Sequence, residues 1–218
     1  MNKAIIIAAA LTIGCSQTQA QGNVKNIGKN NITLNSKLMT PEALWAMGRI
    51  AGAQASPDGK NIVYQVGYYS VKENRGHQVL YIMPADGKEN KLLTTDAKSE
   101  TDAVWIEGGK RIAFLREGQI WAMNPDGTGR QQLTHDKTGI DGFKFSPDGQ
   151  SVILIKQIPY NVTIQKNPAD LPKTTGMVIT DMNYRHWDEY VTSIPHPFLA
   201  AVTANGIGEG KDIMEGEP

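Results

Sequence analysis

The stretch Ser56-Pro57-Asp58-Gly59 returns along the chain as Ser146-Pro147-Asp148-Gly149, with a degenerate copy, Ile106-Glu107-Gly108-Gly109, between them. A second series comprises Pro84-Ala85-Asp86-Gly87 and Asn124-Pro125-Asp126-Gly127. Pro, Asp and Gly supply the backbone angles of tight turns, so both series predict reversals of the chain. The spacing is regular, because Gly87 to Gly127 and Gly109 to Gly149 each span 40 residues.

Apolar residues keep step with these turns. Trp105 and Phe145 each stand four residues before the first glycine of their repeat, and Tyr81 and Trp121 each stand six before the second. Four short β-rich runs therefore recur about every 40 residues, which is the length and content of a propeller blade. The sequence predicts an all-β fold, a partial β-propeller of about three four-stranded blades. We interpret Trp105, Trp121 and Phe145 as core residues of the blades.

A short helix precedes the blades. Thr40-Pro41-Glu42 combines a capping hydroxyl, a proline where no N–H is needed and an acid near the positive end of a helix. Leu44, Met47 and Ile50 would share one face of this helix, and Gly52 could end it.

The third blade contains a long insertion. Asn205-Gly206 matches the second turn of a blade, with its third strand at Phe198 to Thr203 and its fourth at Asp212-Ile213-Met214. About 39 residues are inserted before it, at roughly 157–196, whereas blade one has a shorter loop at 67–78. Both insertions join strands two and three of a blade, so they share the face opposite the tight turns.

Within the insertion, Tyr184, Arg185, His186 and Trp187 concentrate amphipathic rings and charge. Such groups are enriched where protein surfaces meet, and a loop of this length inside a compact domain is usually functional. We therefore predict that these four residues contact a substrate or partner, with packing onto blade three as the alternative interpretation. His186 and His196 lie near acids, but no metal-ligand spacing is present, and no metal or cofactor is predicted.

The first twenty residues have the features of an export signal: Lys3, an apolar stretch from Ala4 to Ile13, and then small and polar residues. Two processing sites remain open, cleavage after Ala20 or lipid attachment at Cys15 within a lipobox-like Thr-Ile-Gly-Cys. Either would place the protein in the periplasm or on a lipid anchor of a Gram-negative bacterium. We predict a signal at 1–20, a flexible leader at 21–38 and an incomplete propeller domain at 39–218.

Composition excludes several classes of function. The 22 Lys+Arg and 22 Asp+Glu residues cancel, which argues against a nucleic-acid binder. The single cysteine excludes a disulfide framework and a cysteine-based zinc site, and the mature part has no apolar run long enough to span a membrane. No serine lies in a Gly-x-Ser-x-Gly elbow, so no catalytic residue is predicted, and Ser56 and Ser146 are interpreted as structural residues of their turns.

The blades resemble the repeat shared by TolB-like proteins and the prolyl oligopeptidase family. The segments Met39 to Ile50, Tyr184 to Glu189 and Ile194 to Phe198 are similar to exported dipeptidyl-peptidase and acylaminoacyl-peptidase relatives of Bacteroides-type bacteria. This resemblance implies a propeller followed by a C-terminal α/β-hydrolase domain with a Ser, Asp and His triad. In such serine peptidases the propeller restricts entry to short peptides and helps to position them.

The resemblance covers about residues 39–218, and this sequence stops before a hydrolase domain would begin. The expectation is therefore a propeller fragment of a secreted serine peptidase that is inactive by itself. Two alternatives stay open: a TolB-like periplasmic propeller acting as a protein-binding module, and a propeller lyase or other sugar-active enzyme.

Overall fold

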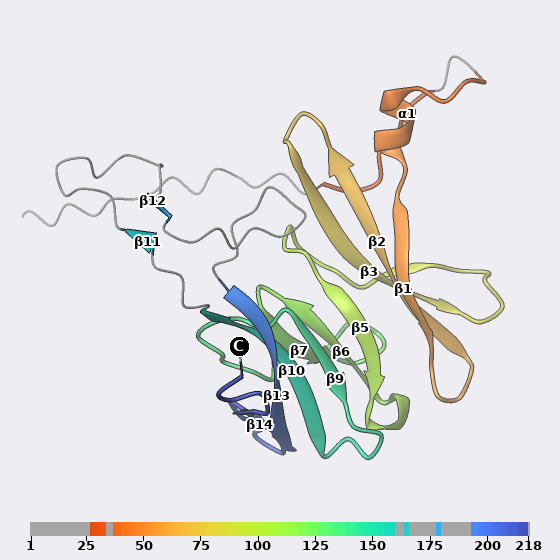
Figure 1. Cartoon of the computed structure of the whole chain (residues 1–218). Coiled ribbons are helices and arrows are strands. Elements are labelled where there is room, and N and C mark those ends of the chain that lie inside the picture. The colour runs from red at the N-terminus through yellow and green to blue at the C-terminus, as the bar shows by residue number, and fades with distance from the viewer. Residues whose placement is uncertain (1–26, 34–36, 160–163, 166–177, 180–192, 218) are drawn as a thin grey trace, which may run out of the picture.

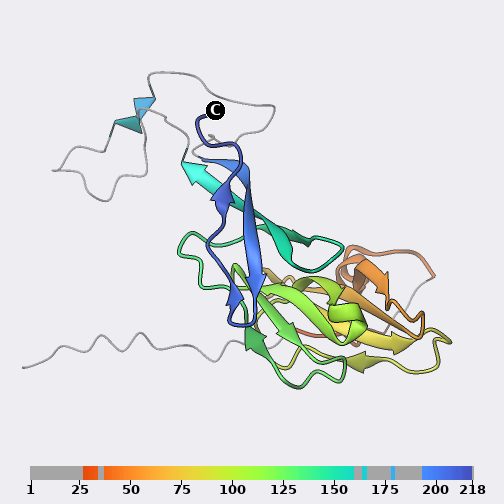
Figure 2. The same ribbon diagram turned by 90° about the horizontal axis from the view of Figure 1, so that it is seen from below.

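The computed structural model describes residues 27–33, 37–159, 164–165, 178–179 and 193–217. Three antiparallel sheets of four or five strands form three blades in the described part of the chain, and blade two lies between blades one and three (Figures 1 and 2). The all-β propeller fold predicted from the turn repeat is confirmed. The part of the chain described in the structure contains no helix long and apolar enough to cross a membrane.

The blades are built from the strands in the order of the sequence. The helix α1 (Pro41–Ala46) precedes blade one, which comprises β1 (Arg49–Ala55), β2 (Asn61–Ser70), β3 (Arg75–Pro84) and β4 (Lys91–Leu92). Blade two comprises β5 (Thr101–Ile106), the one-turn η1 (Glu107–Gly109), β6 (Arg111–Arg116), β7 (Gln119–Met123) and β8 (Gln131–Gln132).

Blade three comprises β9 (Gly142–Phe145), β10 (Ser151–Pro159) and β13 (Ser193–Thr203), and both β14 (Gly206–Ile207) and β15 (Lys211–Asp212) pair with β13. The predicted third strand is present as β13, which begins earlier than expected, but the predicted fourth strand at 212–214 is only partly correct, because β15 ends at Asp212 and both Ile213 and Met214 lie in a turn. Two short strands, β11 (Ile164–Gln165) and β12 (Val178–Ile179), pair only with each other.

The Ser-Pro-Asp-Gly turns are held by their own side chains. The Ser56 hydroxyl donates to Asp58 Oδ1 at 2.6 Å and accepts from the Asn61 N–H at 3.0 Å. Ser146 repeats this geometry, donating to Asp148 at 2.6 Å. The serine hydroxyl, followed by a backbone N–H, holds the pKa of each aspartate below its ordinary value. Both serines are thus structural residues of their turns, as predicted.

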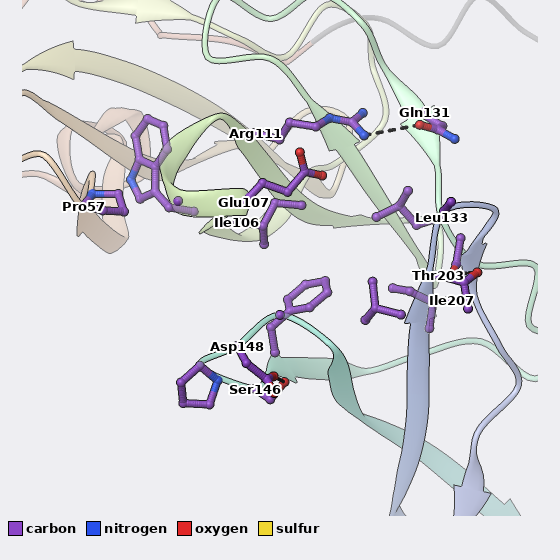
Figure 3. Close-up of a pocket in the computed structure, with 18 residues that line it drawn as sticks. Pro57, Ile106, Glu107, Arg111, Gln131, Leu133, Ser146, Asp148, Thr203 and Ile207 are labelled. Carbon is purple, nitrogen blue, oxygen red and sulfur yellow. Dashed lines mark hydrogen bonds between the residues drawn. The ribbon is translucent and has the colours of Figure 1, made fainter.

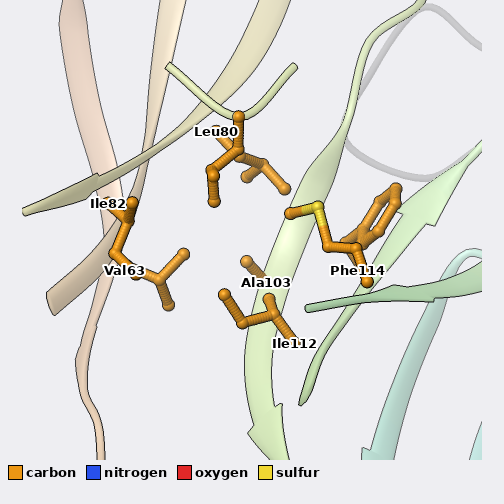
Figure 4. Packing of buried hydrophobic residues seen from close by; sticks show 8 residues of the cluster. Val63, Leu80, Ile82, Ala103, Ile112 and Phe114 are labelled. Atoms are coloured by element: carbon orange, nitrogen blue, oxygen red, sulfur yellow. The ribbon is translucent and has the colours of Figure 1, made fainter. Parts of the chain in front are cut away.

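Side chains that alternate along the strands fill two cores between the blades. The residue four after the first glycine of a repeat, such as Val63 or Ala113, faces the next blade. The residue five after it, such as Phe114 or Leu154, faces the preceding blade. Figure 4 shows the first core, where Phe114 and Val63 meet between blades one and two. The ring residues predicted as core (Trp105, Trp121 and Phe145) are partly buried against these cores.

The helix is shorter than the sequence pattern predicted. The Thr40 hydroxyl caps it by accepting from the Ala43 N–H at 3.2 Å, but Met47 is already extended and the helix ends at Ala46. Gly48 follows, where a Cβ would lie 2.9 Å from the side chains of Val66 and Tyr68. The chain therefore passes tightly over blade one and enters a strand.

Ile50 consequently belongs to β1, and the predicted apolar helix face of Leu44, Met47 and Ile50 is wrong; all three side chains are exposed. Gly52 has a φ of +58° beside the β-bulge between Ala51 and Gln54. It permits this bulge rather than ending the helix.

Two predicted loops are partly strand. The 67–78 segment forms the end of a long hairpin, paired as far as Ser70 with Arg75, because its alternating residues continue the ladder. At the other insertion, Gln157 pairs with Pro195 and Pro159 with Ser193. The expected boundaries of 157 and 196 therefore move inward, to residues 160–192.

Part of the predicted flexible leader is packed. Ile27 is buried against Val66, Tyr68 and Val79 on the face of blade one that points away from blade two. Its carbonyl oxygen lies 2.7 Å from Nδ1 of the buried His77. Apolar burial and this hydrogen bond offset the entropy lost on ordering the segment.

Candidate functional site

The two ends of the blades differ. The tight turns at 56–59, 107–109 and 146–149 lie on one face, which we call the turn face (Figure 1). The tip of the β2–β3 hairpin and the connection from Pro159 to Ser193 leave from the opposite face, which we call the insertion face. Among the described residues, a pocket lies on each of these two faces.

The larger pocket is a cavity of about 490 Å³ on the turn face, between blades two and three (Figure 3). Its walls are mainly apolar and come from both blades: Trp105, Ile106, Leu133, Phe145, Val202 and Ile207. Polar side chains of blade two, including Glu107, Arg111 and Gln131, also line it. A concave apolar site with a few polar groups is the usual form of a small-molecule pocket.

The second pocket, of about 380 Å³, lies on the insertion face beside the start of β1. The Arg49 guanidinium lies 5.0 Å from the ring centroid of Trp45 and 4.3 Å from that of Tyr69. The two rings meet edge to face at 5.8 Å. These cation–π contacts hold a positive charge at the surface, where it can attract an anionic group.

A buried charge cluster ties blade two to the segment that enters it. Glu100 is fully buried and bonds to the guanidinium groups of Arg116, at 3.1 Å, and Arg130. It also accepts from the Thr94 hydroxyl at 2.8 Å, and Arg116 bonds to Asp96 at 2.6 Å. Because every charge has an opposite partner, the cluster fixes the blades and offers no free acid or base.

The next junction carries a shorter version of this cluster, displaced by 40 residues along the chain. Asp136 and Lys156 stand where Asp96 and Arg116 stand, and their charged atoms are 2.9 Å apart. Burial works against the charge of Asp136, but hydrogen bonds from Thr138 and Lys156 hold the pKa of its carboxyl below its ordinary value.

Replacing Lys156 by methionine should lower the free energy of unfolding by about 1.5–3 kcal/mol at neutral pH, because a hydrogen bond to a buried charge is lost. An aspartate whose pKa is lowered by folding stabilises the protein above its unfolded value of about 3.9, and this stability is lost as the pH falls through the folded value. Urea unfolding at several acidic pH values should therefore show that the free energy of unfolding falls less steeply with decreasing pH in Lys156→Met than in the parent protein.

The exposed pair of Lys88 and Asp86, also 2.9 Å apart, provides the matched control. Lys88→Met should leave the unfolding midpoint unchanged, because surface ion pairs contribute little. Equal effects of the two substitutions would contradict the assignment of Lys156 to a buried structural pair.

A histidine and an aspartate pair in blade three. His196 Nδ1 lies 2.8 Å from Asp212 Oδ2. Burial works against the charge of Asp212, but the hydrogen bond with His196 holds the pKa of its carboxyl below its ordinary value. His196 Nε2 is buried and has no hydrogen-bond partner among the described residues. Without a hydroxyl or thiol on that nitrogen, the pair lacks an activated nucleophile. No three His, Cys, Asp or Glu side chains gather as metal ligands within the described ranges.

The predicted contact residues Tyr184, Arg185, His186 and Trp187 lie outside the described residues, so their role stays a prediction. Glu107, Arg111 and the Arg49 pocket were not predicted as site residues from the sequence. The signal for the first of these was present, since 106–109 is the one first-series turn that departs from Ser-Pro-Asp-Gly.

Dipeptidyl-peptidase 5 of Porphyromonas gingivalis is 41% identical over 224 residues, covering 100% of this chain and 31% of the relative. Dipeptidyl-peptidase 5 of Porphyromonas endodontalis is 41% identical over 190 residues, covering 85% and 27%. The chain is a relative of the dipeptidyl-peptidase 5 proteins. It spans less than a third of the length of these two relatives, and no family model matches it.

Among solved structures, the acylaminoacyl peptidase of Pyrococcus horikoshii matches with a TM-score of 0.52 at 11% identity. The match covers 78% of this chain and 25% of that one. At this identity the likeness shows the fold alone. This fold agrees with the propeller expected from the sequence, and the two relatives confirm the expected resemblance to dipeptidyl peptidases.

Proposed function

We propose that this chain is the propeller part of an exported serine peptidase that hydrolyses short peptides. The observation that carries the proposal is the 41% identity to dipeptidyl-peptidase 5, which extends over the whole chain. The propeller would gate access and position the substrate, while a C-terminal α/β-hydrolase domain would perform acyl transfer through a triad.

The geometry supports an auxiliary rather than a catalytic role. The charged clusters of the described blades are neutralised within themselves, at Glu100 and at Asp136. The insertion face carries the Arg49 pocket, and β10 ends and β13 begins there, at Pro159 and Ser193. Those are features for contacting another domain or a peptide, and the predicted residues Tyr184 to Trp187 would act there.

A chimera tests this proposal. The segment of the P. gingivalis dipeptidyl-peptidase 5 that aligns with this chain would be replaced by residues 1–218. If this chain gates a peptidase, the chimera should release dipeptides from a short fluorogenic peptide with a kcat/KM within about tenfold of the parent enzyme. It should cleave an unfolded protein far more slowly than the short peptide.

Two controls define the result. The 218-residue chain alone should not react with a fluorophosphonate probe, because covalent acyl transfer needs an activated serine. A chimera that melts as cooperatively as the parent but cleaves neither substrate would contradict the proposal. So would a chimera that cleaves the protein as fast as the peptide, because its propeller would not be gating.

A further inference from the structure

The cavity on the turn face exists because one turn departs from the repeat. At the junction of blades one and two, Pro57 closes against Gly109, where a Cβ would lie 3.0 Å from the proline ring. At the junction of blades two and three the corresponding residues are Glu107 and Gly149. A Cβ at Gly149 would meet nothing within 4 Å. Without a proline at position 107, the second junction stays open.

The turn that replaces Ser-Pro-Asp-Gly has a left-handed backbone conformation. Glu107 has a φ of +54° and is followed by Gly108 at +66° and Gly109 at +92°. The same pair of left-handed angles recurs at Glu117 and Gly118, with φ values of +51° and +68°, and is the geometry of a tight hairpin turn. At 106–109 the turn places Glu107 on the wall of a cavity that also has the charged residues Arg111 and Asp148 in its lining.

Two opposite charges line the same wall. Figure 3 shows the Glu107 and Arg111 side chains on the blade-two side of the cavity, with the Ile207 side chain across the gap. The Glu107 carboxylate has no ion pair or hydrogen bond to any described side chain. Arg111 bonds only to neutral groups, Gln131 Oε1 at 3.3 Å and the Gly129 carbonyl at 3.1 Å, so no carboxylate within the described ranges neutralises it.

We propose that this cavity binds a small zwitterion with an apolar side chain, namely a free hydrophobic α-amino acid. Its ammonium group would bind Glu107, its carboxylate would bind Arg111, and its side chain would lie among Trp105, Phe145 and the aliphatic residues of blade three. The volume of about 490 Å³ lies within the ordinary range for small-ligand sites. This binding activity goes beyond the proposed peptidase role and does not depend on it.

The primary test is calorimetric titration of the 218-residue chain with leucine, N-acetyl-leucine and leucinamide. Leucine should bind with a Kd of about 1 mM, as suits so small a ligand. N-acetyl-leucine lacks the ammonium group and leucinamide lacks the carboxylate. Because each loses one charge-assisted contact, each should bind at least about tenfold more weakly.

Variants assign the two charges. Glu107→Gln and Arg111→Gln should each weaken leucine binding by about tenfold or more. After Glu107→Gln, leucine should bind no more tightly than N-acetyl-leucine, because the contact to the ammonium group is already gone. Glu89→Gln and Lys110→Gln make the same changes of charge at other exposed positions and should leave the Kd unchanged.

Restoring the sequence of the repeat at this turn provides a second test of the cavity. The combined substitutions Ile106→Ser, Glu107→Pro and Gly108→Asp recreate the turn of blade one and should close the cavity against Gly149. This variant should still unfold cooperatively, at a melting temperature lowered by the loss of the Ile106 contacts with the second core, and should lose leucine binding. The proposal is overturned if leucine shows no heat of binding at about ten times the expected Kd. It is equally overturned if all three ligands bind alike, or if the restored turn binds leucine as the parent does.

Discussion

Replacing Glu100 by alanine should lower the free energy of unfolding by about 3–5 kcal/mol, a large part of the roughly 5–15 kcal/mol that a domain of this kind has. The carboxylate is fully buried and is shared by Arg116 and Arg130. Its loss leaves the half-buried Arg130 guanidinium with the Leu93 carbonyl, at 2.7 Å, as its acceptor among the described residues. Equilibrium urea unfolding at neutral pH measures the effect.

Blade three supplies the matched control, because Ile140 stands 40 residues after Glu100 and is buried without charge. Glu100→Ile combined with Arg130→Met removes both charges and should recover most of the stability lost in Glu100→Ala. A loss below about 1 kcal/mol in Glu100→Ala would contradict a structural role for the cluster. So would a double variant as unstable as the single one.

Replacing Phe114 by alanine should cost about 3–5 kcal/mol, because its fully buried ring fills the core between blades one and two (Figure 4). The cost includes the contact with the Arg130 guanidinium, 5.3 Å from the ring centroid. The two blades are expected to unfold together, so thermal and urea transitions should shift without a change in cooperativity.

The repeat again provides a graded control. Leu154 occupies the position of Phe114 in blade three, so Phe114→Leu should cost clearly less than Phe114→Ala. Leu92→Ala removes an exposed leucine and should change stability by less than about 0.5 kcal/mol. Equal losses for Phe114→Leu and Phe114→Ala would show that the ring volume is not what holds the junction.

The turn repeat made the blades predictable because Pro-Asp-Gly turns act locally and their spacing sets the strand register. The helix limit was not predictable, since Gly48 is required by a contact with Val66 and Tyr68 that lies far along the chain. The burial of Ile27 likewise depends on a tertiary partner, His77. Residues 67–78 were predicted as a loop, because the number of extra residues alone does not distinguish a loop from a longer pair of strands.

The candidate site also has features that are visible in the sequence and features that depend on tertiary contacts. The departure of 106–109 from the repeat was visible in the sequence, but its consequence, an open junction at Gly149, appears only when two blades are placed side by side. The Arg49 pocket brings together Trp45 and Tyr69 from α1 and β2, and no sequence period links them. Tyr184 to Trp187 remain predicted by composition alone.

The arrangement of the two cores has a consequence for how the chain folds. Each core joins neighbouring blades, and the contacts of the first core connect residues between Val63 and Met123, within about two successive repeats. Loop closure over such short separations costs little entropy, and the first junction can form before blade three has been made. Folding can therefore proceed in step with the appearance of the chain, from the amino end onward. The side chains of the buried Glu100 cluster all come from residues 94–130, so we expect this cluster to form before blade three.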